Sequence, residues 1–279
     1  MWVKICANTN LADAHLAATL HADAVGFVFA PSTRQMTAAA VGAITPLLPA
    51  ELDKIGVFHS QDAEEILATV REAGLTGVQL HRAYLPSLVV ELRKALPKEE
   101  GRVRILQTVH WDVAATESES ASQPERFARE IRQIAENGLV DAILVDSSTK
   151  SGSGGTGVSF NWKRAAQAIA DAQIPIVVAG GLRPTNVAEA VETLCPWGVD
   201  VASGVEAEPG IKDPEKVRLF LANAKATAEE AQTGRVSRCA PVELPALFSG
   251  DPDSRAFQRL YACAPCRRSR RRPLRPHRR

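Results

Sequence analysis

Two side chains of this sequence are suited to proton transfer, and each stands at the end of an apolar run. Cys6 ends the opening run MWVKIC, and Asp146 ends the later run DAILVD. A thiol can act as a base and a carboxyl group as an acid, and the carboxyl ends of parallel strands meet at one edge of a sheet. We therefore expect Cys6 and Asp146 to form an acid/base pair that moves a proton within a substrate.

Glycine-bearing turns follow two further apolar runs and predict a phosphate site. The turn AGGLRPTNV contains Gly180 and Gly181 and precedes a helix expected to start near Pro184, while ASGVE contains Ser203 and Gly204. Open backbone amides and helix dipoles commonly hold a dianion in the last two loops of a barrel. One such turn alone can simply let a strand end tightly. The two together favour a phosphorylated small-molecule substrate.

The elements that must position these residues alternate along the chain. Short β-rich runs and helical patterns recur about every 20–30 residues, which is typical of repeated βα units and a parallel sheet. Eight strands followed by eight helices predict a closed (β/α)8 TIM barrel, whose active site is built from the loops after the strands. An open doubly wound sheet is the alternative. The expected strands are Trp2–Cys6, Ala24–Phe29, Lys54–Phe58, Gly77–Leu80, Val103–Thr108, Ala142–Val145, Ile176–Ala179 and Val199–Ala202.

Charge is unevenly distributed along the 279 residues. Residues 231–279 hold 12 Arg and 3 acidic residues, so of the 33 basic and 32 acidic residues in the chain 21 and 29 precede them, a net charge of −8. Such an acidic body offers no general attraction to nucleic acid or anionic lipid. No apolar run approaches the ~20 residues of a membrane span, and the first ten residues lack the pattern of a secretory signal. We expect a cytoplasmic protein without membrane contact.

The chain divides near residue 231. We expect residues 1–231 to form the barrel domain and residues 232–279 to form an Arg-rich extension, which ends CAPCRRSRRRPLRPHRR. Such a Pro-broken segment cannot bury enough apolar surface to fold alone, so it is predicted to be disordered or irregular. Binding of RNA or another polyanion through its arginines stays open, as does an extension without function. The extension lacks the ligand spacing of a zinc site, and no metal is expected.

A set of motifs, in order along residues 1–225, resembles the phosphoribosylanthranilate isomerase family of tryptophan biosynthesis. The motifs are KICANTNLADAHLAATLHADAVGFVFAPSTRQ, VGVF, VQLH, the run from DAILVD through GGTGVSFNW, VVAGGLRPTNVAEAV and GVDVASGVEAEPGIKDPEKV. The resemblance implies a barrel enzyme without a metal or organic cofactor. Its reaction would be an aldose-ketose isomerisation, the Amadori rearrangement of N-(5-phosphoribosyl)anthranilate to 1-(2-carboxyphenylamino)-1-deoxyribulose 5-phosphate.

The resemblance also implies roles for individual residues. Asp146 would protonate the ring oxygen as the furanose opens, and Cys6 would remove the proton from C2 of the resulting Schiff base. These roles need a thiolate from a group with an ordinary pKa of about 8.5 and a proton held by a group with an ordinary pKa of about 3.9. Arg34 matches the arginine that holds the anthranilate carboxylate. Gln79 and His81 are expected to contact substrate from the fourth strand, although a buried histidine satisfied by a neighbour is the alternative for His81.

The chain departs from the family pattern at a few positions near the site. Ala7 and Asn8 stand where the family usually has glycine and an aliphatic residue, and Arg82 stands where glycine often follows the histidine. If the glycine serves a positive φ, alanine would cost about 1 kcal/mol there. Two other functions stay open, a related sugar-phosphate barrel isomerase and a non-catalytic paralogue that binds a phosphorylated ligand. Both a monomer and a homodimer are compatible with the sequence.

Overall fold

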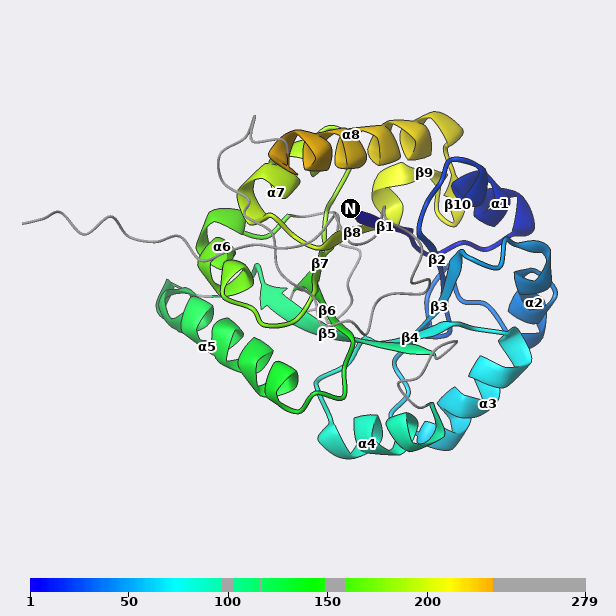
Figure 1. The fold of residues 1–279 in the computed structure, drawn as a ribbon, viewed down its shortest axis with the longest axis horizontal. Coiled ribbons are helices and arrows are strands. Elements are labelled where there is room, and N and C mark those ends of the chain that lie inside the picture. The colour runs from blue at the N-terminus through cyan, green and yellow to red at the C-terminus, as the bar shows by residue number, and fades with distance from the viewer. Residues whose placement is uncertain (97–102, 116, 149–158, 233–279) are drawn as a thin grey trace, which may run out of the picture.

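The chain folds into a closed parallel β-barrel surrounded by helices (Figure 1). A computed structural model describes residues 1–96, 103–115, 117–148 and 159–232. Neighbouring strands pair in parallel in chain order, and β8 returns to pair with β1. The predicted barrel is therefore confirmed, and the open sheet is wrong. The strands are β1 (Trp2–Ile5), β2 (Ala24–Val28), β3 (Asp53–Phe58), β4 (Gly77–Leu80), β5 (Arg104–Asp112), β6 (Ala142–Ser148), β7 (Ile176–Val178) and β8 (Gly198–Val201).

Two strands run further than their apolar residues indicated. β5 and β6 were expected to end at Thr108 and Val145, but they continue to Asp112 and Ser148. Their ladder includes the pair His110↔Asp146, which an apolar pattern cannot reveal because both side chains are polar. Asp146 accordingly lies within β6 and not after it.

Helices cover the outside of the barrel, and local capping explains where several of them begin. Asn10 accepts a hydrogen bond from the Asp13 amide at the start of α1, and Asp62 caps α3, which ends at Gly74 with φ +60°. The helices are α1 (Leu11–Thr19), α2 (Ala38–Gly42), α3 (Ala63–Ala73), α4 (Pro86–Ala95), α5 (Glu117–Glu136), α6 (Trp162–Ala170), α7 (Val187–Leu194) and α8 (Pro214–Gln232), with short 3-10 turns η1 (Thr45–Leu47) and η2 (Ser203–Val205).

Two details after β7 and β8 differ from the sequence-based expectation. α7 begins at Val187 and not near Pro184, because the Asn186 side chain accepts a hydrogen bond from the Arg183 amide and closes a turn first. After η2 the chain forms an unpredicted antiparallel hairpin, β9 (Glu206–Glu208) and β10 (Ile211–Lys212). This hairpin carries side chains into the site described below.

The inner and outer faces of the barrel have different chemistry. Side chains alternate along each strand, so Val3 and Ile5 of β1 pack toward the helices, while Trp2 and Lys4 lie on the opposite, inner face. A cluster confined to strands and their ends fills the inner face: Trp2, Ala24, Ile55, Leu106, Ala142, Leu144, Val177 and Ala179. Above this apolar layer the interior turns polar, with Lys4, Gln79, Asp146 and Asp200 all buried.

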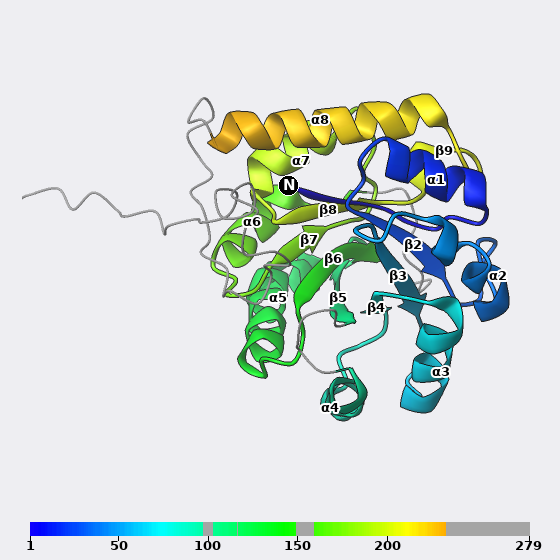
Figure 2. The same cartoon turned by 45° about the vertical axis from the view of Figure 1, so that its right-hand side comes forward.

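The seam of the barrel is covered by the last helix. α8 lies beside α7 and contacts β1, and both Figure 1 and Figure 2 show it between α7 and α1 on the outside of β8 and β1. No helix in the described ranges is long and apolar enough to cross a bilayer. The Arg-rich extension was predicted over residues 232–279; residue 232 still belongs to α8, and residues 233–279 lie outside the described part.

Candidate active site

Cys6 lies directly after β1 and touches a buried lysine. Lys4 shares the inner face with Cys6 because side chains two apart on a strand point the same way. The Lys4 ammonium donates to Cys6 Sγ at 3.2 Å and to Gln79 Oε1 at 2.8 Å, and it pairs with Asp200 Oδ1 at 3.1 Å. The ladder between β1 and β8 sets Lys4 opposite Asp200. The thiol is thus one end of a network that joins β1, β4 and β8.

The loop after Cys6 explains the departure noted at Ala7 and Asn8. Ala7 has φ +59°, so this position does use the left-handed conformation that favours glycine. Asn8 is fully buried and its amide side chain donates to the carbonyl oxygens of Ile5 at 2.8 Å and Gly26 at 3.2 Å. These bonds hold the loop in place although alanine occupies the strained position.

Asp146 is a buried carboxyl group with an unusual proton affinity. It is 8% exposed, and within the described part of the chain its Oδ1 has no hydrogen-bond partner. Burial raises the pKa of Asp146 from 3.8 to about 7, and the Asp200 carboxylate adds to the rise. Asp146 therefore holds a proton in a large fraction of molecules at neutral pH, as a general acid must.

The Cys6 thiol is shifted in the same direction by opposing causes. Burial raises the pKa of Cys6 above its ordinary value, the Lys4 ammonium opposes that rise, and the Asp200 carboxylate adds to it. Lys4 and Asp200 also act in opposite senses on Asp146. The Lys4–Asp200 pair is therefore within electrostatic reach of both candidate catalytic groups.

The glycine turns after β7 and β8 lie together, although their glycines serve different purposes. Gly180 and Gly181 have φ values of +80° and +66°, and a Cβ at Gly180 would lie 2.8 Å from Asp146 Oδ1. Gly180 thus leaves space beside the acid. A Cβ at Gly204 would lie 1.9 Å from the Leu182 carbonyl oxygen, so this glycine lets the two loops touch. A side chain at Gly204 would therefore meet the backbone of Leu182 first.

Arg34, which follows β2, already binds a carboxylate of the protein. Its Nε and Nη2 donate to Oε1 and Oε2 of Glu206 at 2.8 and 2.6 Å. Lys212 also reaches Glu206 Oε1, at 3.3 Å. Burial would raise the pKa of Glu206, but Arg34 and Lys212 outweigh burial and lower it, so Glu206 stays ionised. The Nη1–Nη2 edge of Arg34 bears one 3.4 Å contact, to Thr33 Oγ1, and could face a second carboxylate.

The two predicted residues of β4 have different surroundings. Gln79 is 2% exposed and accepts from Lys4, so it supports the lysine inside the barrel, and its expected contact with substrate stays a prediction. His81 stacks on His59 with ring centres 5.2 Å apart and meets the edge of His110 at 4.9 Å. Burial lowers the pKa of His81 to about 3, with His110 and His59 adding to the effect. His81 is consequently a neutral ring in a cluster of histidines.

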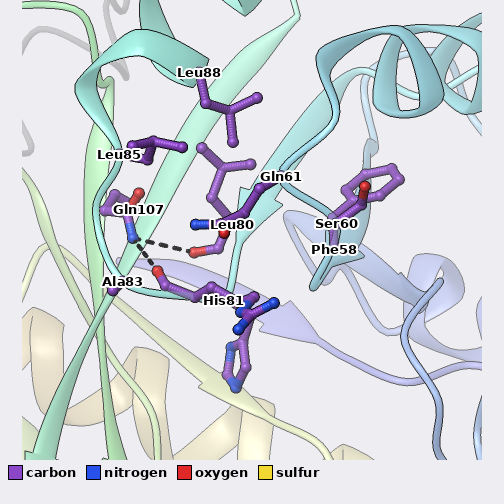
Figure 3. A pocket seen from close by; sticks show the side chains of 10 residues that line it. Phe58, Ser60, Gln61, Leu80, His81, Ala83, Leu85, Leu88 and Gln107 are labelled. Atoms are coloured by element: carbon purple, nitrogen blue, oxygen red, sulfur yellow. Dashed lines mark hydrogen bonds between the residues drawn. The ribbon is translucent and has the colours of Figure 1, made fainter.

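A small pocket is lined in part by His81. In Figure 3, Gln107 faces the turn after β4, where its Nε2 donates to the carbonyl oxygens of Arg82 at 2.8 Å and Leu80 at 3.4 Å. The pocket holds about 10 Å³, roughly the space of one water, so it is far too small for a phosphorylated substrate. Arg82, where the family often has glycine, is thereby held through its backbone. The lining residues are Phe58, Ser60, Gln61, Leu80, His81, Arg82, Ala83, Leu85, Leu88 and Gln107.

Sequence reasoning missed several residues of this site. Lys4 and Asp200 each interrupt an apolar strand. Since a charged residue in a buried strand must be paired, the sequence did indicate that these two residues need partners. His59 and His110 follow or end the same kind of apolar run that pointed to His81. The sequence contains no comparable indication for Glu206, because Glu206 lies in a short two-stranded hairpin that shows no hydrophobic periodicity. Within the described ranges, no three His, Cys, Asp or Glu side chains gather closely enough to hold a metal ion.

Comparison with known proteins places these features in a family. Residues 3–223 match the family model described as N-(5'phosphoribosyl)anthranilate (PRA) isomerase. The N-(5'-phosphoribosyl)anthranilate isomerase of Pelobacter propionicus is 39% identical over 230 residues, which is 82% of this chain and 98% of that protein. The Nostoc punctiforme enzyme of the same name is 38% identical over 224 residues, covering 79% and 97%.

Solved structures agree with these sequence matches. Phosphoribosyl anthranilate isomerase from Thermotoga maritima is 32% identical with a TM-score of 0.67, covering 81% of this chain and 99% of that one. A structure of a phosphoribosyl anthranilate isomerase in complex with reduced 1-(o-carboxyphenylamino)-1-deoxyribulose 5-phosphate is 29% identical with a TM-score of 0.63, with the same coverage. Another Thermotoga maritima structure, 30% identical with a TM-score of 0.64 over the same shares of the chains, is described as monomers of a dimeric enzyme.

Proposed function

The chain belongs to the N-(5'-phosphoribosyl)anthranilate isomerase family, and we propose that Cys6 and Asp146 are the base and the acid of its reaction. The enzyme converts N-(5'-phosphoribosyl)anthranilate to 1-(2-carboxyphenylamino)-1-deoxyribulose 5-phosphate in tryptophan biosynthesis. The observation that carries the assignment is the buried Asp146 carboxyl, whose pKa of about 7 suits a proton donor at neutrality.

The reaction divides into two proton transfers. Asp146 gives its proton to the furanose ring oxygen as the C1–O bond breaks, and the lone pair of the anthranilate nitrogen forms the C1=N bond of a Schiff base. The Cys6 thiolate then takes the proton from C2, and the C–H electrons move through C1 to the nitrogen. The resulting enolamine carries a hydroxyl on C2 and tautomerises to the ketone. Each group thus acts once, in the ionisation state opposite to the other.

Two further groups bind the ends of the substrate in this proposal. The amides around Gly180, Gly181, Ser203 and Gly204 hold the phosphate, which is supported by the contact between the two loops at Leu182. The Nη1–Nη2 edge of Arg34 binds the anthranilate carboxylate, because Glu206 occupies the other edge and fixes the plane of the guanidinium.

Loss of either proton-transfer group tests the assignment of base and acid. Cys6→Ser and Asp146→Asn should each lower kcat at least ~100-fold while circular dichroism shows a native fold. Asp171→Asn, at the exposed C-terminal end of α6, is the matched control and should keep full activity. Complementation of a tryptophan auxotroph that lacks the isomerase should follow the same pattern. Retention of most activity by Cys6→Ser would show that another group is the base.

The phosphate site has its own test. Crystals soaked in sulfate should hold an anion on the amides of the two loops after β7 and β8. If sulfate fully occupies some other position while these amides bind no anion, the proposed phosphate site is wrong.

The cellular setting is also part of the proposal. A biosynthetic enzyme that acts on a phosphorylated metabolite is expected in the cytoplasm, and cell fractionation tests this. Because a relative from Thermotoga maritima is described as dimeric, a homodimer is proposed beside a monomer, and sedimentation equilibrium distinguishes the two.

A further inference from the structure

Lys4 is a buried charge that the two proton transfers do not use. It is 0% exposed and is among the largest fully buried side chains of the described chain. Moving an ammonium group out of water is costly, and an apolar residue of similar volume is often at least as stable in such a place. The Asp200 carboxylate raises the pKa of Lys4 against the effect of burial, so the side chain stays a cation.

The position of the Lys4 ammonium is fully determined by its partners. An ammonium has three N–H donors, and those of Lys4 are directed at Cys6 Sγ, Gln79 Oε1 and Asp200 Oδ1, at 3.2, 2.8 and 3.1 Å. β2 leaves room for this arrangement at Gly26, where a Cβ would lie 2.6 Å from Cys6 Sγ and 2.9 Å from Lys4 Cε. Two of the three partners hold the lysine, and the third is the thiol.

Closure of the barrel alone does not explain the contact with sulfur. Pairing with Asp200 joins β1 to β8, and this pairing does not require that the ammonium also touch sulfur. A neutral thiol is a weak acceptor that gains little from a full positive charge, whereas a thiolate gains a charge-assisted hydrogen bond. The 3.2 Å contact is therefore useful chiefly in the state of Cys6 that can accept a proton.

We propose that Lys4 is the positioning residue of the catalytic base: held by Asp200 and Gln79, its ammonium stabilises the Cys6 thiolate and so sets the fraction of enzyme that can take the proton from C2. This role rests on the assignment of Cys6 as the base. Asp200 has two opposing effects, since it holds Lys4 in place and its own charge disfavours the thiolate.

The balance of protons makes this fraction decisive. Catalysis needs Cys6 deprotonated and Asp146 protonated, while burial raises the pKa of Cys6 above its ordinary value and raises that of Asp146 to about 7. Between these two values the correctly ionised form is a minor and constant fraction of the enzyme. It falls tenfold for each unit by which the pKa of Cys6 rises, and kcat/KM falls with it.

Direct titration of the thiol tests the proposal. We would label cysteine with ¹³Cβ in the full-length protein, identify the Cys6 signal by its loss in Cys6→Ser, and follow it against pH. Lys4→Met should raise the pKa of Cys6 by about one unit or more, because a cation in contact with sulfur is lost, and should lower kcat/KM near pH 8 about tenfold or more.

Lys54→Met is the matched control. Lys54 lies near the start of β3, is also buried, and its ammonium donates to the carbonyl oxygens of Pro49 and Ala50. The same substitution there should leave the pKa of Cys6 unchanged.

Two results would overturn the role of Lys4. One is an unmoved thiol pKa in Lys4→Met, and the other is an equal shift in Lys54→Met. If Lys4→Met does not fold, Lys4→Gln, which keeps a polar side chain without the charge, gives the same test, and an unmoved thiol pKa in that variant overturns the role as well. A Cys6→Ser enzyme that keeps its activity rejects the base assignment instead, so the two failures are distinguishable.

Discussion

The two ends of the barrel both contain buried ionisable side chains, but they differ in how fully these side chains are hydrogen-bonded. At the amino-terminal end, all five N–H donors of Arg93 bind the Asp141 carboxylate and the carbonyl oxygens of Leu96, Val103 and Leu139. At the carboxyl-terminal end, one oxygen of Asp146 has no partner among the described residues, and the loop after Cys6 is strained.

The difference teaches how one barrel separates stability from reactivity. A buried ion pair with every donor used resists both proton transfer and movement. A carboxyl group that burial leaves short of partners has a raised pKa, so it still carries a proton at neutral pH and can donate it, at a cost in stability. The comparison predicts that substitutions at the amino-terminal end change unfolding, and that substitutions at the carboxyl-terminal end change turnover.

The largest expected effect on stability is at the amino-terminal end. Arg93→Met leaves Asp141 buried without its cation and should lower the free energy of unfolding by about 3–5 kcal/mol. Urea denaturation measures this loss, while kcat at 25 °C should stay within twofold of the wild type. Arg71→Met, on an exposed turn of α3, is the control and should change neither quantity. If Arg93→Met lost as much kcat as Cys6→Ser, the idea that the amino-terminal end affects stability and not turnover would be wrong.

Asp146→Asn, at the carboxyl-terminal end, is expected to raise the free energy of unfolding above pH 7, whereas Arg93→Met lowers it. The pKa of Asp146 is about 7 in the folded protein against 3.8 as its ordinary value, so the folded state keeps a proton that the unfolded chain loses between these pH values. The stability that this proton contributes is present below pH 3.8 and is lost as the pH rises through 7. The variant, which does not titrate, should therefore be more stable than the wild type above pH 7, by up to about 4 kcal/mol.

Thermal unfolding of the two proteins from pH 4 to pH 8 checks this. The difference in Tm should be largest at pH 8 and should shrink toward pH 4. A difference that does not depend on pH would mean that Asp146 is not a strained carboxyl group.

The smallest effect is expected at Ala7. Replacement by glycine relieves a left-handed alanine, which costs about 1–2 kcal/mol, and gives back about 0.4–1 kcal/mol through the more flexible unfolded chain. Ala7→Gly should therefore gain roughly 0.5–1 kcal/mol in urea denaturation. Ala12→Gly, on an exposed helical position of α1, should lose a similar amount. Equal losses in both variants would show that the loop after Cys6 is unstrained.

Much of the fold could be predicted because barrels repeat one local pattern. Each βα unit has a recognisable pattern of about 20–30 residues. The predicted strand bounds therefore agree with the structure within one or two residues, except at the ends of β5 and β6, where polar side chains replace apolar ones. Cys6 and Asp146 became candidates by the same route, since each stands where an apolar run stops.

The contacts that tune these residues could not be predicted so easily. Glu206 holds Arg34 across 172 positions of the chain, and the geometry depends on a hairpin with no periodicity. The pairing of Lys4 with Asp200 follows from the register of β1 against β8, which exists only once the barrel has closed. Burial of the two candidate catalytic groups, which shifts their pKa values, is likewise a property of the assembled barrel.

The ladder between β1 and β8 also decides when this enzyme becomes active during its synthesis. Lys4 and Asp200 are separated by 196 positions, so a chain still on the ribosome contains Cys6 but has no completed site until β8 has left the exit tunnel. Before that moment the edge of β1 that faces β8 is unpaired, and Lys4 has no Asp200 carboxylate beside it. Translation therefore delivers Cys6, the proposed base, at the beginning, and supplies Asp200, which completes its surroundings, almost at the end of the barrel.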